Sequence, residues 1–138
     1  MAHIHSEILI DAEPAHVWSA LSDWGALHER LVPGFVVDTQ IDGDARIVTF
    51  GNGVVVRELL LDCDEQQRRL AWSIVDGPYA HHNGVAQVFA LGAGRARFVW
   101  TADLLPNELA EQTRSMMEQG TAVVKRTLET APSAATAS

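Results

Sequence analysis

Short clusters of turn residues divide the middle of this chain into segments of similar length, and this spacing constrains the fold more than any other feature. The clusters are Asp42 to Asp44, Gly51 to Gly53, Asp64 to Gln67, Asp76 to Pro78 and Gly92 to Gly94. The segments between them are rich in β-branched and aromatic residues, a pattern typical of an antiparallel meander. We predict strands near residues 35–41, 45–51, 53–62, 68–76, 79–91 and 95–104.

The flanking segments predict one more strand, two short helices and one long helix. Residues 3–10 alternate with the period of a strand, and a helix is expected to begin at Pro14, since proline is favoured at the first helical position. A second short apolar segment runs from Leu27 to Val32. The long helix is expected to begin at Pro106 and continue to about Glu129, with an inner stripe made of Leu109, Thr113, Met116, Gly120, Val123 or Val124, and Thr127.

This order of elements predicts the α+β class. A seven-stranded antiparallel sheet would have to curve around the final helix to bury the apolar faces of both. The length of 138 residues suits one domain, which we place at residues 1–130. The segment 131–138 lacks a hydrophobic face, and we predict that this tail is disordered.

Composition narrows the range of partners. With 10 basic and 18 acidic residues the formal charge is −8, which disfavours nucleic acid and anionic lipid surfaces. Cys63 is the single cysteine, so the chain can form neither an internal disulfide nor a cysteine-based zinc cluster. No secretory leader or membrane span is evident in the sequence. We therefore expect a cytoplasmic protein, a monomer or homodimer, that binds neither nucleic acid nor the membrane interior.

The Gly92 to Gly94 turn sets the register of the last hairpin, because a three-residue loop pairs Ala90 with Ala96. The face with little charge is expected to be concave. It carries His82, Gly84, Ala86, Val88, Ala90, Ala96, Phe98, Trp100 and Ala102. The same alternation directs Leu70, Trp72 and Ile74 inward from the neighbouring strand, and Val54, Val56, Glu58 and Leu60 from the strand before it.

Glu58 is thus a carboxylate on an apolar face. Burial of an ionised carboxylate requires a hydrogen-bonding partner, bound water or a ligand. The alternative is a register slip or bulge that turns Glu58 to solvent and Arg57 inward. His82 poses a similar choice, since a lone histidine on an apolar face is more often structural than catalytic.

Three segments together resemble the polyketide cyclase/dehydrase-like branch of the START-like superfamily, also called SRPBCC. They are AEPAHVWSALSDWGALHERLVPG, VVVRELLLDCDEQQRRLAWSIVDGP and ARFVWTADLLP, and the resemblance covers nearly the whole chain. It implies the helix-grip fold of the birch pollen allergen, with an apolar cavity between sheet and helix. It also implies a small hydrophobic or aromatic ligand, such as a lipid.

Within that superfamily, the middle segment resembles the strand of plant hormone receptors that carries an inward glutamate, and Glu58 matches that residue. Those receptors have a lysine on an earlier strand, for which this chain offers no counterpart, since its single lysine is Lys125 in the last helix. The same ligand is therefore not implied. Many bacterial relatives have a tryptophan before the proline of the segment after the first helix, where this chain has Glu29 to Val32.

Metal and nucleophile chemistry find little support in the sequence. His3 and His5 share a face near the chain end, whereas His81 and His82 alternate, so neither pair forms an obvious chelate. Acidic neighbours disfavour the thiolate of Cys63, and no nucleophile elbow is present. We predict no metal and no cofactor. The candidate catalytic residues for general acid-base catalysis are Glu58 and His82, with His28 or Tyr79 as further proton-transfer groups.

We expect the ligand-binding residues to lie around the concave face. The candidates are Trp24, His28, Val56, Glu58, Trp72, Tyr79, His82, Phe98, Trp100, Met116 and Gly120. The tryptophans and methionines also fit an ordinary core, His28 also fits a solvated helix, and Gly120 also fits close packing. Three functions stay open at this point: binding or carriage of a small hydrophobic molecule, a cyclase- or dehydratase-like enzyme in the same cavity, and a protein-interaction module without ligand.

Overall fold

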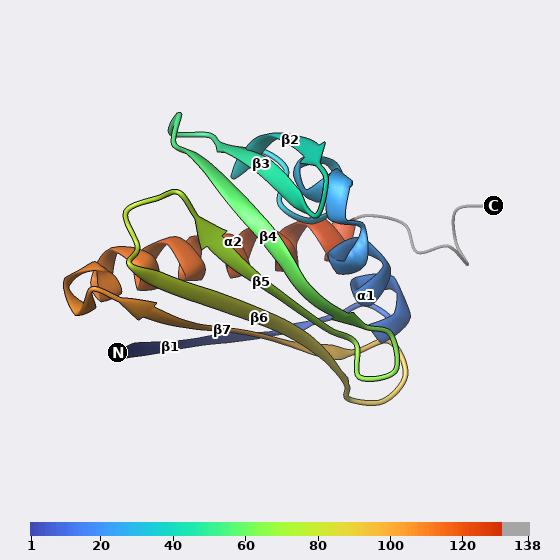
Figure 1. Cartoon of the computed structure of the whole chain (residues 1–138). Helices are drawn as coiled ribbons and strands as arrows, with labels where there is room; N and C mark the ends of the chain where they lie inside the picture. The colour runs from blue at the N-terminus through green and yellow to red at the C-terminus, as the bar shows by residue number, and fades with distance from the viewer. Residues whose placement is uncertain (131–138) are drawn as a thin grey trace.

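The computed structural model describes residues 1–130, and the predicted disordered tail lies outside the described residues. Seven antiparallel strands form one curved sheet in the order β1-β7-β6-β5-β4-β3-β2, with a long helix along its concave face (Figure 1). This arrangement confirms the predicted fold class. The strands are β1 (Ala2–Ile10), β2 (Val36–Asp42), β3 (Ala45–Phe50), β4 (Val55–Asp64), β5 (Arg69–Val75), β6 (His81–Ala90) and β7 (Ala96–Leu105).

Short helices connect β1 to β2. Helix α1 (Pro14–Ser22) begins at the predicted proline, and the 3₁₀ turn η1 (Trp24–Ala26) leads into η2 (Leu27–Leu31). The last of these is a π-helical turn in which the Val32 amide donates to the Leu27 carbonyl at 3.0 Å. It occupies the predicted second apolar segment and turns Leu27 and Leu31 inward.

The long helix begins later than predicted. Pro106 has extended backbone angles and precedes a 3₁₀ turn, η3 (Asn107–Leu109), so the α-helix α2 (Ala110–Thr130) starts four residues after the proline. The predicted stripe was partly wrong for the same reason, because its phase was counted from Leu109. The fully buried positions of α2 are Thr113, Met117, Gly120, Thr121, Val124 and Leu128, whereas Met116 and Thr127 lie at the edge of the stripe.

The strand faces agree with the predicted register. Ala90 pairs with Ala96 in the last hairpin, and Leu70, Trp72 and Ile74 are buried. Two positions differ. Val54 is 51% exposed, because it closes the Gly51 to Gly53 turn by accepting a hydrogen bond from the Phe50 amide and so precedes β4. Ala90 is exposed at the end of β6, beside the turn.

A register shift does interrupt β4, but it lies between Leu60 and Asp62, beyond Glu58. Glu58 therefore keeps the inward phase, opposite Arg46 of β3 and Ile74 of β5. Helix α2 packs against β1 and β7 on one side and against η2 on the other. The core fills the space between them, and the site described next lies within it.

Candidate ligand-binding cavity

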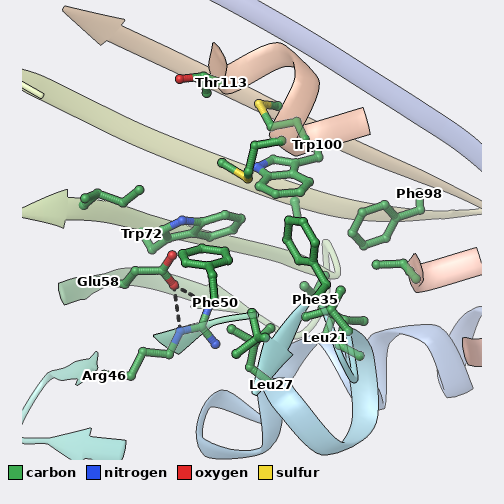
Figure 2. Close-up of a pocket in the computed structure, with 18 of the residues that line it drawn as sticks. Leu21, Leu27, Phe35, Arg46, Phe50, Glu58, Trp72, Phe98, Trp100 and Thr113 are labelled. Carbon is green, nitrogen blue, oxygen red and sulfur yellow. Dashed lines mark hydrogen bonds and ion pairs between the residues drawn. The ribbon is translucent and has the colours of Figure 1, made fainter. Parts of the chain in front are cut away.

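An internal cavity of about 60 Å³ lies between the sheet and α2. Most of its wall is apolar, and Figure 2 shows aromatic rings converging on it from several elements. The lining residues are Leu21, Leu27, Leu31, Val32, Phe35, Val36, Arg46, Phe50, Glu58, Trp72, Ile74, His82, Ala86, Phe98, Trp100, Thr113, Met116, Met117 and Val124. A space of this size holds a few water molecules rather than a large ligand.

A second, larger cleft of about 570 Å³ adjoins the cavity. Five residues line both spaces and therefore divide them: Phe35, Phe50, Ile74, Thr113 and Met116. The rings of Phe35 and Phe50 meet edge to face with centroids 5.5 Å apart. Phe35 precedes β2 and Phe50 ends β3, and the Gly51 amide donates to the Phe35 carbonyl at 2.9 Å. The two rings form a side-chain barrier between an outer cleft and an inner cavity.

Arg46 and Glu58 form a buried ion pair in the cavity wall. They are 3% and 6% exposed, and both Nε and Nη2 of Arg46 lie 2.8 Å from the same oxygen, Oε1 of Glu58. The pair arises because the two residues face each other across β3 and β4. Figure 2 shows the other carboxylate oxygen directed away from Arg46. The partner that burial of Glu58 requires is thus supplied by the protein.

Trp24 completes the surroundings of the Arg46 guanidinium. Its ring centroid lies 3.7 Å from the Arg46 Cζ, a cation–π contact, and its carbonyl accepts from Arg46 Nη1 at 3.1 Å. Burial lowers the pKa of Arg46, while the attraction of Glu58 opposes that effect. Arginine starts so far above neutral pH that the guanidinium stays charged. The pair therefore contributes an ionised carboxylate and no net charge to the cavity.

His82 is a neutral ring in the same wall. The Ile74 amide donates to His82 Nδ1 at 3.1 Å, which places the proton of the neutral ring on Nε2. Burial is the largest cause that lowers the pKa of His82 from 6.5 to about 4, and the nearby His81 adds to it. The Tyr79 ring lies 5.0 Å from the imidazole, and the Tyr79 hydroxyl is hydrogen-bonded to Thr113 of α2 at 2.7 Å.

The structure brings most of the candidate residues to these two spaces. Glu58, Trp72, His82, Phe98, Trp100 and Met116 line the inner cavity, while Val56, Tyr79 and Met116 line the outer cleft. Trp100 also carries a buried Nε1 with no hydrogen-bond partner in the described residues. These positions make the residues available to a ligand, and their role in binding stays a prediction.

The other candidates lie behind or beside the wall. Trp24 supports Arg46 from outside the cavity, and His28 is hydrogen-bonded to Thr39 at 3.0 Å and paired with Glu29. At Gly120 an added methyl carbon would stand 2.8 Å from Trp100 and 3.3 Å from Phe35. Glycine at this position therefore lets α2 approach those two rings.

Sequence reasoning missed Arg46, Phe35, Phe50 and Thr113. A signal for Arg46 was present in the sequence. The Gly51 to Gly53 turn places Phe50 opposite Val54, and four residues further along each strand this pairing places Arg46 opposite Glu58. Phe35 and Phe50 stand at the ends of strands, where alternation carries no information about direction. They meet because β2 pairs with β3, which places Val36 opposite Phe50 and the Gly51 amide against the Phe35 carbonyl.

Two negative findings apply to residues 1–130. None of the helices described there combines the length and apolar character needed to cross a bilayer. The same part of the chain contains no cluster of three or more histidine, cysteine, aspartate or glutamate side chains placed to hold a metal ion.

Solved structures resemble this fold closely. A protein from Thermobifida fusca is 26% identical, with a TM-score of 0.75 over 94% of this chain and 91% of that one. The di-domain ARO/CYC BexL is 19% identical with a TM-score of 0.77, over 94% of this chain and 47% of its own. Norcoclaurine synthase from Thalictrum flavum, in complex with dopamine and hydroxybenzaldehyde, is 19% identical with a TM-score of 0.68. The match covers 95% of this chain and 88% of that chain.

No curated protein sequence matches the chain at a significant level. The family described as "Polyketide cyclase / dehydrase and lipid transport" matches residues 1–130, which include every strand and helix described above. The helix-grip architecture, the cavity beneath α2 and this match agree with the resemblance found in the sequence. The chain therefore belongs to the polyketide cyclase/dehydrase and lipid transport family.

Proposed function

We propose that residues 1–130 form a single domain that binds or carries a small hydrophobic or aromatic molecule between the concave face of the sheet and α2. The observation that carries this proposal is the pair of adjoining spaces, an apolar inner cavity and a larger outer cleft, separated by the side chains of Phe35 and Phe50. Apolar pockets with a few placed polar groups are the usual form of small-molecule sites. Membership of a family that includes lipid transport supports the same proposal.

The inner cavity is too small to hold a typical ligand unless side chains move, whereas the outer cleft is large enough. Its volume of about 60 Å³ is far below the roughly 300–1,000 Å³ of common ligand pockets, whereas the outer cleft of about 570 Å³ falls within that range. A ligand would first occupy the outer cleft and then reach Glu58 and His82 by displacing Phe35 and Phe50. Ring rotation at the ends of two strands leaves the sheet itself unchanged.

Titration with Nile red, a neutral dye whose fluorescence rises in apolar surroundings, tests the proposal. We expect saturable binding to the wild type. Ala86→Leu should weaken it at least about tenfold, because Ala86 lines the inner cavity and the added carbons fill it. Ala90→Leu is the matched control, since Ala90 lies on the same strand but is exposed. Circular dichroism of both variants checks that they fold.

Native mass spectrometry of the purified protein adds a search for a retained molecule. Absence of saturable Nile red binding to the folded wild type would overturn the proposal. Equal affinity of the wild type and a folded Ala86→Leu variant for Nile red would show that the dye binds elsewhere, and the assignment of the site to the inner cavity would be wrong. A retained molecule that competes with Nile red would identify the ligand.

A cyclase- or dehydratase-like enzyme is the second candidate. The observation that favours it is the presence of a carboxylate and a neutral imidazole in the same cavity wall, since these two groups can accept and donate protons. An enzyme would convert a bound molecule, and dehydration would lower its mass by one water. Incubation of a competing molecule with the wild type and Glu58→Gln, followed by chromatography and mass spectrometry, separates the two functions, because chromatography resolves a cyclised isomer of unchanged mass. Conversion by the wild type alone would favour the enzyme, and unchanged recovery would favour the carrier.

A further inference from the structure

We propose that the cavity selects a neutral molecule with a hydroxyl group and excludes carboxylates, because Arg46 neutralises Glu58 while one Glu58 oxygen remains as an acceptor. This inference rests on the proposed binding function and names the class of ligand for that site. It depends on three features of the wall: the free side of the Glu58 carboxylate, the compensated charge of Arg46, and the uncharged state of His82.

The first feature is the asymmetry of the ion pair. Both short contacts from Arg46 end on Glu58 Oε1. In the described residues Oε2 receives no hydrogen bond, and Figure 2 shows it on the side of the carboxylate away from Arg46. An ionised carboxylate oxygen accepts hydrogen bonds and donates none. A ligand group at this oxygen must therefore supply the proton, as a hydroxyl does.

The second feature is that Glu58 already compensates the charge of Arg46, and three of the five guanidinium N–H groups already have protein partners. Its Nε and Nη2 contact Glu58, its Nη1 contacts the Trp24 carbonyl, and the Trp24 ring covers one face of the guanidinium. Arg46 and Glu58 are the charged residues among those that line the inner cavity, so their charges cancel there. A ligand carboxylate at Oε2 would be a buried charge without a partner and would stand beside a like charge.

The third feature is His82. With Nδ1 occupied by the Ile74 amide, the ring presents an N–H at Nε2 and no charge near neutral pH. It can donate one hydrogen bond to a ligand oxygen without attracting an anion strongly. The wall thus offers a set of groups that carries no net charge once Arg46 is included: an acceptor at Glu58 Oε2, and N–H donors at His82 and at Trp100 Nε1, which is unpartnered within residues 1–130. This set complements a neutral hydroxyl-bearing molecule.

Replacement of Glu58 by glutamine should change the ligand class. Gln keeps the shape of the side chain and removes its charge, so the guanidinium of Arg46 becomes an uncompensated cation in the cavity wall. Naphthol and naphthoate with the same ring position are suitable probes, because both fluoresce and they differ in the group compared. At neutral pH the naphthol is neutral and the naphthoate is ionised.

Fluorescence titrations of both probes against three proteins test the inference. We expect the wild type to bind naphthol at least about tenfold more tightly than naphthoate. Glu58→Gln should bind naphthoate at least about tenfold more tightly than the wild type does. Glu118→Gln is the matched control, because Glu118 is an exposed residue of α2 and its replacement removes the same charge from the whole molecule. This control should keep the wild-type preference.

Glu58→Gln leaves Arg46 unpaired, which disfavours folding. A double variant therefore provides a second test. Arg46→Met with Glu58→Gln removes both charges and should be easier to accommodate. This double variant should bind naphthol more weakly than the wild type does, because the charged acceptor is gone, and should not gain affinity for naphthoate. If it binds naphthol as tightly as the wild type does, Glu58 does not hold the hydroxyl group and the inference is wrong.

The outcomes separate this inference from the proposed function. Equal wild-type affinity for the two probes, or a folded Glu58→Gln that binds naphthoate no better than the wild type, overturns the inference. Binding of Nile red without binding of naphthol also overturns it, while the proposed binding function stands. If the wild type binds none of the three molecules, both proposals fail.

Discussion

At the scale of single residues, the protein keeps a charged pair in a place where an apolar pair would fit. Arg46 and Glu58 are both buried, and each supplies the partner that the other needs. Desolvation of two charges usually offsets most of their attraction, so such a pair adds little net stability, yet loss of one partner is expensive. Removal of one partner should therefore cost more stability than replacement of both residues by apolar ones.

Arg46→Met should lower the free energy of unfolding by about 3–5 kcal/mol, because it leaves the Glu58 charge buried and unpaired. Arg46→Met with Glu58→Leu should recover most of that loss. Urea unfolding of the wild type, Arg46→Met, Glu58→Leu and the double variant gives the coupling energy between the two residues. The exposed pair Arg57 and Asp42, 2.6 Å apart, is the control and should show less than about 1 kcal/mol of coupling. A buried pair that couples no more strongly than this control would contradict the prediction.

His82 predicts a dependence of stability on pH. The unfolded chain binds a proton at this residue below about 6.5, whereas the folded protein does so below about 4. The unfolded state therefore holds more protons between these values, and stability should fall as pH decreases from 6.5 to 4, by about 3 kcal/mol in total. Urea unfolding across this range measures the loss.

His82→Asn removes the titration and retains an acceptor for the Ile74 amide. The decline between these pH values should become shallower in this variant. His81→Asn changes the exposed neighbour and should keep most of the wild-type slope. If His82→Asn and the wild type lose stability in parallel, another group causes the decline.

At the scale of elements, the approach of α2 to the sheet depends on a residue that weakens a helix. Glycine in a helix interior costs about 1 kcal/mol relative to alanine, so helix propensity alone predicts that Gly120→Ala is stabilising. The contacts predict the opposite. A methyl carbon there would stand 2.8 Å from the Trp100 ring and 3.3 Å from Phe35, so the rings or the helix must move.

We expect Gly120→Ala to lower stability by about 1–3 kcal/mol, the usual range for overpacking, and to change tryptophan fluorescence. Thermal and urea unfolding measure the first effect, and emission spectra of the folded variant measure the second. Ser115→Ala, at an exposed position of the same helix, is the control and should raise stability slightly. A stabilised Gly120→Ala with unchanged emission would show that Trp100 does not limit the helix approach.

At the scale of the whole molecule, the sheet and α2 enclose two spaces that side chains keep apart. The main chain at Phe35 and Phe50 is fixed by the hydrogen bond between Gly51 and the Phe35 carbonyl. A methyl carbon at Gly51 would stand 2.6 Å from the Gly34 carbonyl oxygen, so these two turns lie in close contact. Under the proposed function, we therefore expect ligand entry to require ring rotation more than movement of the loops.

Phe35→Ala should join the two spaces and speed the binding of Nile red several-fold, because it removes one ring of the barrier. The loss of stability should stay below the roughly 3–5 kcal/mol typical of a fully buried phenylalanine, since Phe35 is half-buried. Stopped-flow fluorescence gives the association rate. Phe89→Ala removes a half-buried ring from the opposite face of the sheet and should leave that rate unchanged. Equal rates for Phe35→Ala and the wild type would place the entrance elsewhere.

The sequence by itself predicted the strands, the register of the last hairpin and most of the faces that the strands bury, because side-chain alternation and turn chemistry are local properties. The Gly92 to Gly94 turn gave the pairing of Ala90 with Ala96, and the phase of β4 turned Glu58 inward. The start of α2 was wrong by four residues, since Pro106 is followed by a 3₁₀ turn that the apolar pattern does not reveal.

The tertiary structure decided what surrounds Glu58. Trp24 lies against Arg46 because η1 folds back toward β3, and α2 closes over Trp100 and Phe35 because Gly120 lets the helix approach both rings. Each of these contacts joins residues whose placement depends on the packing of separate elements. A local pattern therefore identified a buried carboxylate, while the packing of the whole chain supplied its partner and set the volume beside it.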